Sequence, residues 1–106
     1  MNKETALQNQ IIAALCVRGC VARNHTVGVF YTPQGKKIAI GHPGEADIDG
    51  HRPDGRAFYI EVKLPGQSPR QNQRDFLAAM GASGALAGVA HSAEEAMEIV
   101  FGKENQ

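Results

Sequence analysis

A glutamate and a lysine two residues apart stand out in this sequence, because together they can hold a metal ion or move a proton. Glu61 and Lys63 belong to Ala-Phe-Tyr-Ile-Glu-Val-Lys (57–63), in which side chains of opposite character alternate. The alternation predicts a β-strand, and successive side chains of a strand point to opposite faces. Glu61 and Lys63 are therefore expected to lie side by side on one face.

A second carboxylate comes from the segment before this strand. Gly50 and residues 52–55 (Arg-Pro-Asp-Gly) are typical of a turn, so the flanking segments are predicted to form a β-hairpin. The hairpin would bring Asp47, or alternatively Asp49, beside Glu61 and its lysine. Two carboxylates and one ammonium group would then converge on one patch.

This combination of groups suits metal-assisted hydrolysis of a phosphodiester. Two close carboxylates resist ionising together unless a positive charge lies between them. Mg²⁺ takes oxygen ligands and usually keeps several waters, and a lysine beside it can orient the attacking water and stabilise charge on a phosphate. Glu-x-Lys alone is more simply explained by a surface hairpin with an ion pair, so the surrounding sequence must decide.

Length and composition indicate an ordinary globular chain. It has 106 residues, 42% of them hydrophobic and 21% charged, which predicts one domain over residues 1–106. No apolar run approaches membrane-spanning length and the N-terminus lacks a signal-peptide core, so the cytoplasm is the expected location. Cys16 and Cys20 have no partner pair or local histidine cluster, which favours free thiols over a zinc site.

Charge is distributed unevenly along the chain. The net charge is zero, but residues 92–106 hold four acids and one base, whereas residues 1–91 hold seven acids and ten bases. A bound cation would offset the acids of the predicted site, and the remaining surface is compatible with phosphate binding. That surface includes Arg52 and Arg56, and the candidate phosphate contacts on it are Lys36, Lys37, Arg70 and Arg74. A solvated basic face is the alternative for each.

Residues 4–18 are predicted to form an amphipathic helix that stops at Gly19. Glu4 and Gln8 are spaced to share the helix face that carries its apolar residues, so they are expected to border the core. Two interpretations of Glu4 remain open at this point. It either contributes to the site or only favours the dipole at the helix N-terminus.

The segment from 20 to 44 has a mixed pattern. Residues 20–23 and 27–32 are rich in β-formers and are interpreted as one strand broken by a bulge or bend. A turn at 33–35 follows, and 36–40 is predicted to form a short strand or an arm. Gly41 to Gly44 then form a tight loop, whose glycines allow a close approach of the backbone or simply make a turn. His25 and His42 are interpreted as hydrogen-bonded surface residues, with metal or phosphate contact as the alternative.

A second helix is predicted after Leu64 to Gln67. Ser68 is its expected N-cap, with Pro69 at the first position and Gln71 completing the cap, and the helix is expected to run to about Met80 and to end at Gly81. Gln73 lies on the apolar face. It either points towards the strand ends, where it can hold a water or a phosphate oxygen, or is a hydrogen-bonded core residue.

The last third of the chain completes an α/β pattern. Residues 85–90 are predicted to form a buried strand that lies parallel to 57–63 after a helical crossover. Ser92 to Glu95 form a capping box, which opens a final helix that ends at Phe101 before Gly102.

This order of elements, with Asp47 and Glu61-Val62-Lys63 on the central hairpin, resembles the PD-(D/E)XK nuclease core, an α/β restriction-endonuclease-like fold. The resemblance implies an αβββαβ order with a C-terminal helix and a mixed central sheet. The finer similarity is to the small stand-alone VRR-NUC (virus-type replication–repair nuclease) domains. The motifs that carry it are Glu4 and Gln8, Arg23-Asn24 with Gly28, Gly41-His42-Pro43-Gly44-Glu45-Ala46-Asp47, Glu61-Val62-Lys63, and Ser68-Pro69 with Gln73.

The resemblance also implies roles for individual residues. Asp47, Glu61 and the Val62 carbonyl would bind the metal, and Lys63 would act on the nucleophilic water. Glu4 would complete the inner or outer shell of the metal, Gln73 would support the site, and Gln8 would join the basic residues at the DNA. The glutamine assignment is ambiguous, because the helix offers Gln71 as well; the facing argument selects Gln73.

The family further implies Mg²⁺ or Mn²⁺ dependence, a phage or prophage origin, a homodimer, and cleavage of branched DNA such as Holliday junctions. A dimer would place two sites on two strands of opposite polarity. The main alternative is a non-catalytic DNA-binding or dimerisation module that retains the nuclease fold. A metal-independent small-molecule binder has no phosphate loop or cofactor fingerprint to support it.

Overall fold

The structure, a computed structural model, describes residues 2–25, 28–40 and 44–102 of the chain. Three helices and six strands follow one another along it. The helices are α1 (Lys3–Val17), α2 (Gln71–Ala82) and α3 (Ala93–Phe101). The strands are β1 (Val21–Asn24), β2 (Gly28–Tyr31), β3 (Lys37–Ile40), β4 (Ile48–His51), β5 (Ala57–Val62) and β6 (Leu86–Ala90).

Four of the strands form the main sheet, in the order β1-β4-β5-β6. β4 and β5 pair antiparallel with Ile48 opposite Ile60, and β5 and β6 pair parallel with Glu61 opposite Val89. The predicted hairpin and the predicted parallel crossover are both confirmed. The result is the mixed α/β sheet that the sequence led us to expect.

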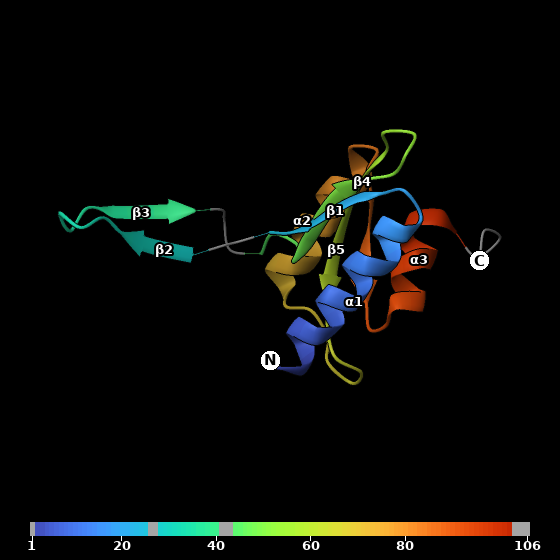
Figure 1. Cartoon of the computed structure of the whole chain (residues 1–106), viewed down its shortest axis with the longest axis horizontal. Coiled ribbons are helices and arrows are strands. Elements are labelled where there is room, and N and C mark those ends of the chain that lie inside the picture. The colour runs from blue at the N-terminus through green and yellow to red at the C-terminus, as the bar shows by residue number, and fades with distance from the viewer. Residues whose placement is uncertain (1, 26–27, 41–43, 103–106) are drawn as a thin grey trace.

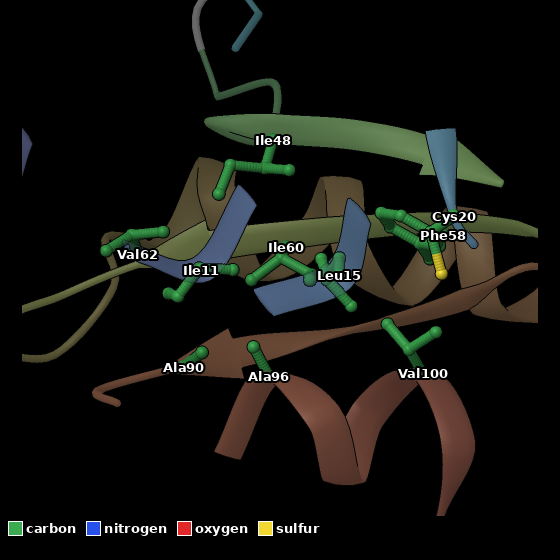
Figure 2. Close-up of a cluster of buried hydrophobic side chains, with 10 residues drawn as sticks. All are labelled: Ile11, Leu15, Cys20, Ile48, Phe58, Ile60, Val62, Ala90, Ala96 and Val100. Carbon is green, nitrogen blue, oxygen red and sulfur yellow. The ribbon is translucent and has the colours of Figure 1, made fainter. Parts of the chain in front are cut away.

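Helices cover both faces of this sheet. α1 and α3 lie side by side over one face, and α2 packs on the other, against β5 and β6 (Figure 1). The core lies on the α1–α3 side and draws on both helices and three strands (Figure 2). Its buried members are Ile11, Leu15, Cys20, Ile48, Phe58, Ile60, Val62, Ala90, Ala96 and Val100.

The alternation of side chains along β5 explains why Glu61 faces away from the core. Phe58, Ile60 and Val62 are fully buried, and each contributes about 1.5–3 kcal/mol of burial to the fold. Because side chains alternate, Tyr59 and Glu61 must point to the opposite face, towards α2. The core thereby fixes the orientation of the site glutamate.

The structure differs from the sequence prediction between residues 20 and 40. The expected single broken strand is wrong, because β1 and β2 belong to different sheets. β1 pairs with β4, whereas β2 pairs antiparallel with β3 in a separate two-stranded sheet. Local β-propensity is similar in the two segments, so only the long-range pairing of β1 with β4 separates them.

The start of α2 also differs from the prediction. Ser68 is not the N-cap; α2 begins at Gln71 with Arg70 as its cap residue. The side chain of Gln73 reaches back, and its Oε1 accepts a hydrogen bond from the Arg70 backbone N–H at 2.8 Å. At α3 the predicted N-cap and helix end are confirmed, since the Ser92 hydroxyl accepts from the Glu95 N–H at 3.1 Å and the helix ends at Phe101. The other half of the predicted capping box differs, because Oε1 of Glu95 accepts from the His91 backbone N–H at 2.8 Å.

Two expectations about the chain as a whole can be compared with the structure. Cys16 and Cys20 are free thiols, the first exposed and the second buried. Within the described ranges, no helix combines the length and apolarity needed to cross a bilayer.

Candidate active site

Asp47 and Glu61 come together where β4 begins and β5 ends. Ile48 is opposite Ile60 in the hairpin, so Asp47 falls beside the end of β5. The backbone N–H of Val62 donates to Oδ2 of Asp47 at 2.9 Å, which holds that carboxylate in place. Of the two aspartates that the sequence offered, the structure therefore brings Asp47 to Glu61.

Glu61 is a buried carboxylate with incomplete hydrogen bonding. Its side chain is only 2% exposed. Oε1 accepts a hydrogen bond from Gln73 Nε2 at 3.1 Å, and Lys63 Nζ lies 3.9 Å from the same oxygen. Oε2 is buried without a hydrogen-bond donor among the described residues. An ionised carboxylate in this position is costly unless a cation also reaches it.

The pKa of Glu61 is raised by the same surroundings. Burial raises the pKa of Glu61 to about 8, and the nearby carboxylates of Asp47 and, more weakly, Glu4 act in the same direction. The ammonium group of Lys63 opposes this shift in pKa without cancelling it. A strongly raised pKa in a carboxylate pair marks a candidate functional site, because a bound cation would relieve the repulsion.

The two candidate glutamines have different surroundings. Gln73 is buried and spans two partners, since it accepts from the Arg70 backbone and donates to Glu61. Gln71 is exposed, and its Nε2 donates to Asp75 Oδ1 at 2.8 Å. Only Gln73 touches the carboxylate pair. The same two hydrogen bonds would also satisfy a structural glutamine of the core, so Gln73 can support both the fold and the site.

α1 contributes at the edge of this cluster. Glu4 and Gln8 are both half-buried, and the charge of Glu4 is close enough to influence Glu61. Among residues 2–25, 28–40 and 44–102, however, no three His, Cys, Asp or Glu side chains gather as a metal-binding group. Glu4 is therefore a neighbour of the Asp47–Glu61 pair rather than an equal third member.

The donor set nevertheless fits a hard divalent cation. Asp47 and Glu61 are both oxygen ligands, and the buried Oε2 of Glu61 lacks a donor. Two carboxylates within hydrogen-bonding range cannot bond while both are ionised, unless a cation lies between them. Mg²⁺ and Mn²⁺ prefer such oxygens and are commonly held by only one or two carboxylates, with waters completing the shell.

A second acidic cluster lies on the same face and was not foreseen from the sequence. Asp49 is paired through both oxygens, to Arg23 Nε at 2.8 Å and to His25 Nδ1 at 3.2 Å, while the other ring nitrogen of His25 pairs with Glu45. Three members of this cluster, His25, Glu45 and Asp49, line a hollow of about 290 Å³ together with Tyr59 and part of α2. The only sequence signal was opposite charge on two strands, and it could be used only once β1 was known to pair with β4.

The remaining predicted contacts are dispersed. Arg70 and Arg74 are exposed at the N-terminus of α2. Lys36 and Lys37 are exposed at the turn of the β2–β3 hairpin. His42, with Gly41 and Pro43, lies outside the described residues. The structure thus brings Asp47, Glu61, Lys63 and Gln73 together, and leaves the four basic residues in two groups.

Gly44 explains how the loop before β4 approaches the site. Its φ is +92°, and a Cβ there would lie 2.9 Å from the backbone oxygen of Asn72 in α2. Any side chain would therefore push the loop away from the helix that carries Gln73. The close approach that a glycine permits is used here for packing between the loop and α2.

Comparison with known proteins agrees with this geometry. No protein-family model matches the chain. No curated protein matches it either. A solved structure described as a "VRR_NUC domain" superposes with a TM-score of 0.69, covering 93% of this chain and 95% of the other at 19% identity. The chain has the fold of a VRR_NUC domain. The predicted resemblance is confirmed for the fold.

Proposed function

We propose that this chain is a metal-dependent, structure-specific DNA endonuclease that hydrolyses phosphodiester bonds in branched DNA such as Holliday junctions. One observation carries the proposal: on a VRR_NUC fold, a buried carboxylate with an oxygen that lacks a donor faces a second carboxylate and a lysine. This supports a site rather than a structural ion pair, since a buried structural pair is expected to satisfy both oxygens.

Each residue of the cluster has a role that its contacts support. Asp47 and Glu61, with the Val62 carbonyl, would hold Mg²⁺ or Mn²⁺, and Glu4 would act on its outer shell. A bound divalent cation polarises the phosphodiester and lowers the pKa of a bound water. Lys63 would orient the attacking water and stabilise charge on the phosphate. Gln73 positions Glu61 through its hydrogen bond.

The fold supports a proposal for the substrate and the assembly. Two strands of a junction have opposite polarity, so a homodimer with a two-fold axis would present one site to each. Arg70, Arg74 and Gln8 would contact the DNA close to the site. Lys36 and Lys37 would contact it further away.

The test is cleavage of a labelled four-way junction beside a linear duplex of matched sequence, with Mg²⁺, Mn²⁺ or EDTA. We expect metal-dependent, symmetric cuts in the junction. Equal cutting of both DNAs would retain the chemistry and overturn the structural specificity. Junction binding without cleavage under any metal would support the non-catalytic binding module instead.

A further inference from the structure

The β2–β3 hairpin, residues 28–40, is here called the arm. It forms a sheet of its own, separate from the main sheet, and extends away from the rest of the molecule along its longest axis (Figure 1). The molecule consequently measures 52 Å along that axis against 33 and 28 Å along the others. An isolated two-stranded hairpin is marginally stable in water. The arm is therefore a segment that gains stability from whatever it contacts outside its own chain.

Charge indicates which kind of partner the arm fits. Residues 28–40 contain Lys36 and Lys37 and no acid, so the rest of the chain holds nine bases against eleven acids. The single basic projection thus extends from a slightly acidic body. Both lysines are exposed, which is the arrangement expected of groups that meet phosphates.

The turn at the end of the arm is internally fixed. The hydroxyl of Thr32 accepts from the Lys36 backbone N–H at 3.0 Å, and the Gly35 N–H donates to the Thr32 carbonyl at 2.8 Å. Tyr31 is opposite Lys37 in the hairpin register and is 69% exposed. An exposed aromatic ring beside an ammonium group offers both stacking and charge to a nucleic acid.

The nearest described residues on either side of the arm, His25 and Gly44, lie close to the candidate active site. On one side, the backbone N–H of His25 donates to the Asp47 carbonyl at 2.7 Å. On the other side, Gly44 packs against Asn72 at the start of α2. DNA held at Asp47 and Glu61 would therefore pass close to the point where the arm leaves the body of the molecule.

We propose that the arm lies along the duplex that flanks the scissile phosphate, with Lys36 and Lys37 on backbone phosphates. Each strand of the arm has four residues, and with the turn at its end the arm reaches about 20 Å, or about six base pairs of duplex. A two-stranded β-ribbon also fits the major groove, which is about 12 Å wide. This inference rests on the proposed function in one respect, since it takes DNA as the partner.

The test is equilibrium binding of labelled junctions whose duplex flanks are shorter or longer than about six base pairs, in EDTA so that cleavage plays no part. For the wild type, we expect affinity to rise at least about tenfold once the flank reaches the arm. For Lys36→Gln/Lys37→Gln, the gain should disappear, and the salt dependence of log K should weaken by about two.

A matched control separates the arm from charge in general. Arg56 lies in the β4–β5 turn, at the opposite end of that hairpin from Asp47 and Glu61. Arg56→Gln removes one charge, as Lys37→Gln does. We expect Lys37→Gln to reduce the salt slope by about one and Arg56→Gln to leave it unchanged.

Three results would overturn the inference. Equal dependence on flank length in wild type and the double variant would remove the arm from the DNA. An unchanged affinity accompanied by a change from dimer to monomer would assign the arm to a second copy of the chain. Absence of any DNA binding would overturn both this inference and the proposed function, whereas arm-dependent binding without metal-dependent cleavage would overturn only the latter.

Discussion

Two acidic clusters lie on the same face of the main sheet, and they are built in opposite ways. At Asp49, both carboxylate oxygens are paired, one to Arg23 and one to His25. At Glu61, one oxygen accepts from Gln73 and the other is buried without a donor among the described residues. The carboxylate of the first cluster is paired through both of its oxygens, whereas the carboxylate of the second keeps one oxygen that no described residue pairs.

This difference distinguishes a structural carboxylate from a candidate metal ligand. Asp49 and its partners join β1 to β4 and the loop before β4, and the exposed position of Arg23 makes that ion pair weak. Glu61 is held in place by Gln73 but is not neutralised by it. A fold tolerates such a group when a bound cation completes it.

The largest difference between the two clusters should appear when a carboxylate of each is neutralised without a change of shape. Asp47→Asn or Glu61→Gln should reduce metal-dependent junction cleavage by about 1000-fold, because a metal contributes several kcal/mol to the transition state. Asp49→Asn should leave cleavage within a few-fold and lower stability by no more than about 1 kcal/mol. Single-turnover cleavage rates and thermal unfolding measure the two effects.

A contrary result would be informative. If Asp49→Asn abolished cleavage while Asp47→Asn did not, the metal would have to be reassigned to the His25 cluster. Folding of each variant, followed by circular dichroism, separates a lost site from a lost structure.

Lys63 belongs only to the cluster around Glu61, so its removal tests that cluster separately. Its Nζ lies 3.9 Å from Glu61 Oε1 and its side chain is 16% exposed. Lys63→Met should lower the single-turnover rate by about 100-fold, as for removal of one preorganised electrostatic group. Mn²⁺ affinity, measured by calorimetry, should change much less. A variant that loses metal affinity in proportion to rate would make Lys63 a structural partner of Glu61.

The sequence pattern places Glu61 and Lys63 together and offers two aspartates beside them, but it does not indicate the partners of Asp49. The alternation in 57–63 fixes Glu61 and Lys63 on one face, and the turn at 52–55 fixes the hairpin with Asp47. Asp49 acquires its partners from residues 24 and 26 positions away, through pairing of β1 with β4. Strand parity alone cannot choose between Asp47 and Asp49, because residues two apart share a face.

The misassigned elements have a similar explanation. Residues 28–31 have strand propensity but leave the main sheet, which no local pattern indicates. Ser68 and Pro69 form a plausible helix start, yet Gln73 provides the cap contact at Arg70 because it is already fixed against Glu61. Tertiary contacts override local propensity in both cases.

Gln73 and Gln71 offer a matched pair on one helix. Gln73→Ala leaves the Arg70 N–H and Glu61 Oε1 without their partner, so we expect a stability loss of about 1–3 kcal/mol and a 10–100-fold loss of metal affinity or activity. Gln71→Ala removes only an exposed contact with Asp75 and should change neither. Gln73→Glu would test charge, because an added carboxylate beside Glu61 should destabilise the metal-free protein.

The stability of the metal-free protein should also depend on pH. Burial raises the pKa of Glu61 from 4.5 to about 8, so the folded state binds this proton more tightly than the unfolded state. The associated stability is fully present below about pH 4.5 and declines as the pH rises to about 8. In EDTA, we expect the decline to exceed about 1 kcal/mol, which lowers Tm by about 4–8 °C.

Glu61→Gln imitates the protonated carboxyl and keeps the contact with Gln73, so its unfolding should lack this component, whereas Asp49→Asn should retain it. Mg²⁺ should restore the wild-type Tm above pH 8, because the cation replaces the proton between the two carboxylates; the same pH slope in Glu61→Gln as in the wild type would mean that the titrating group lies elsewhere.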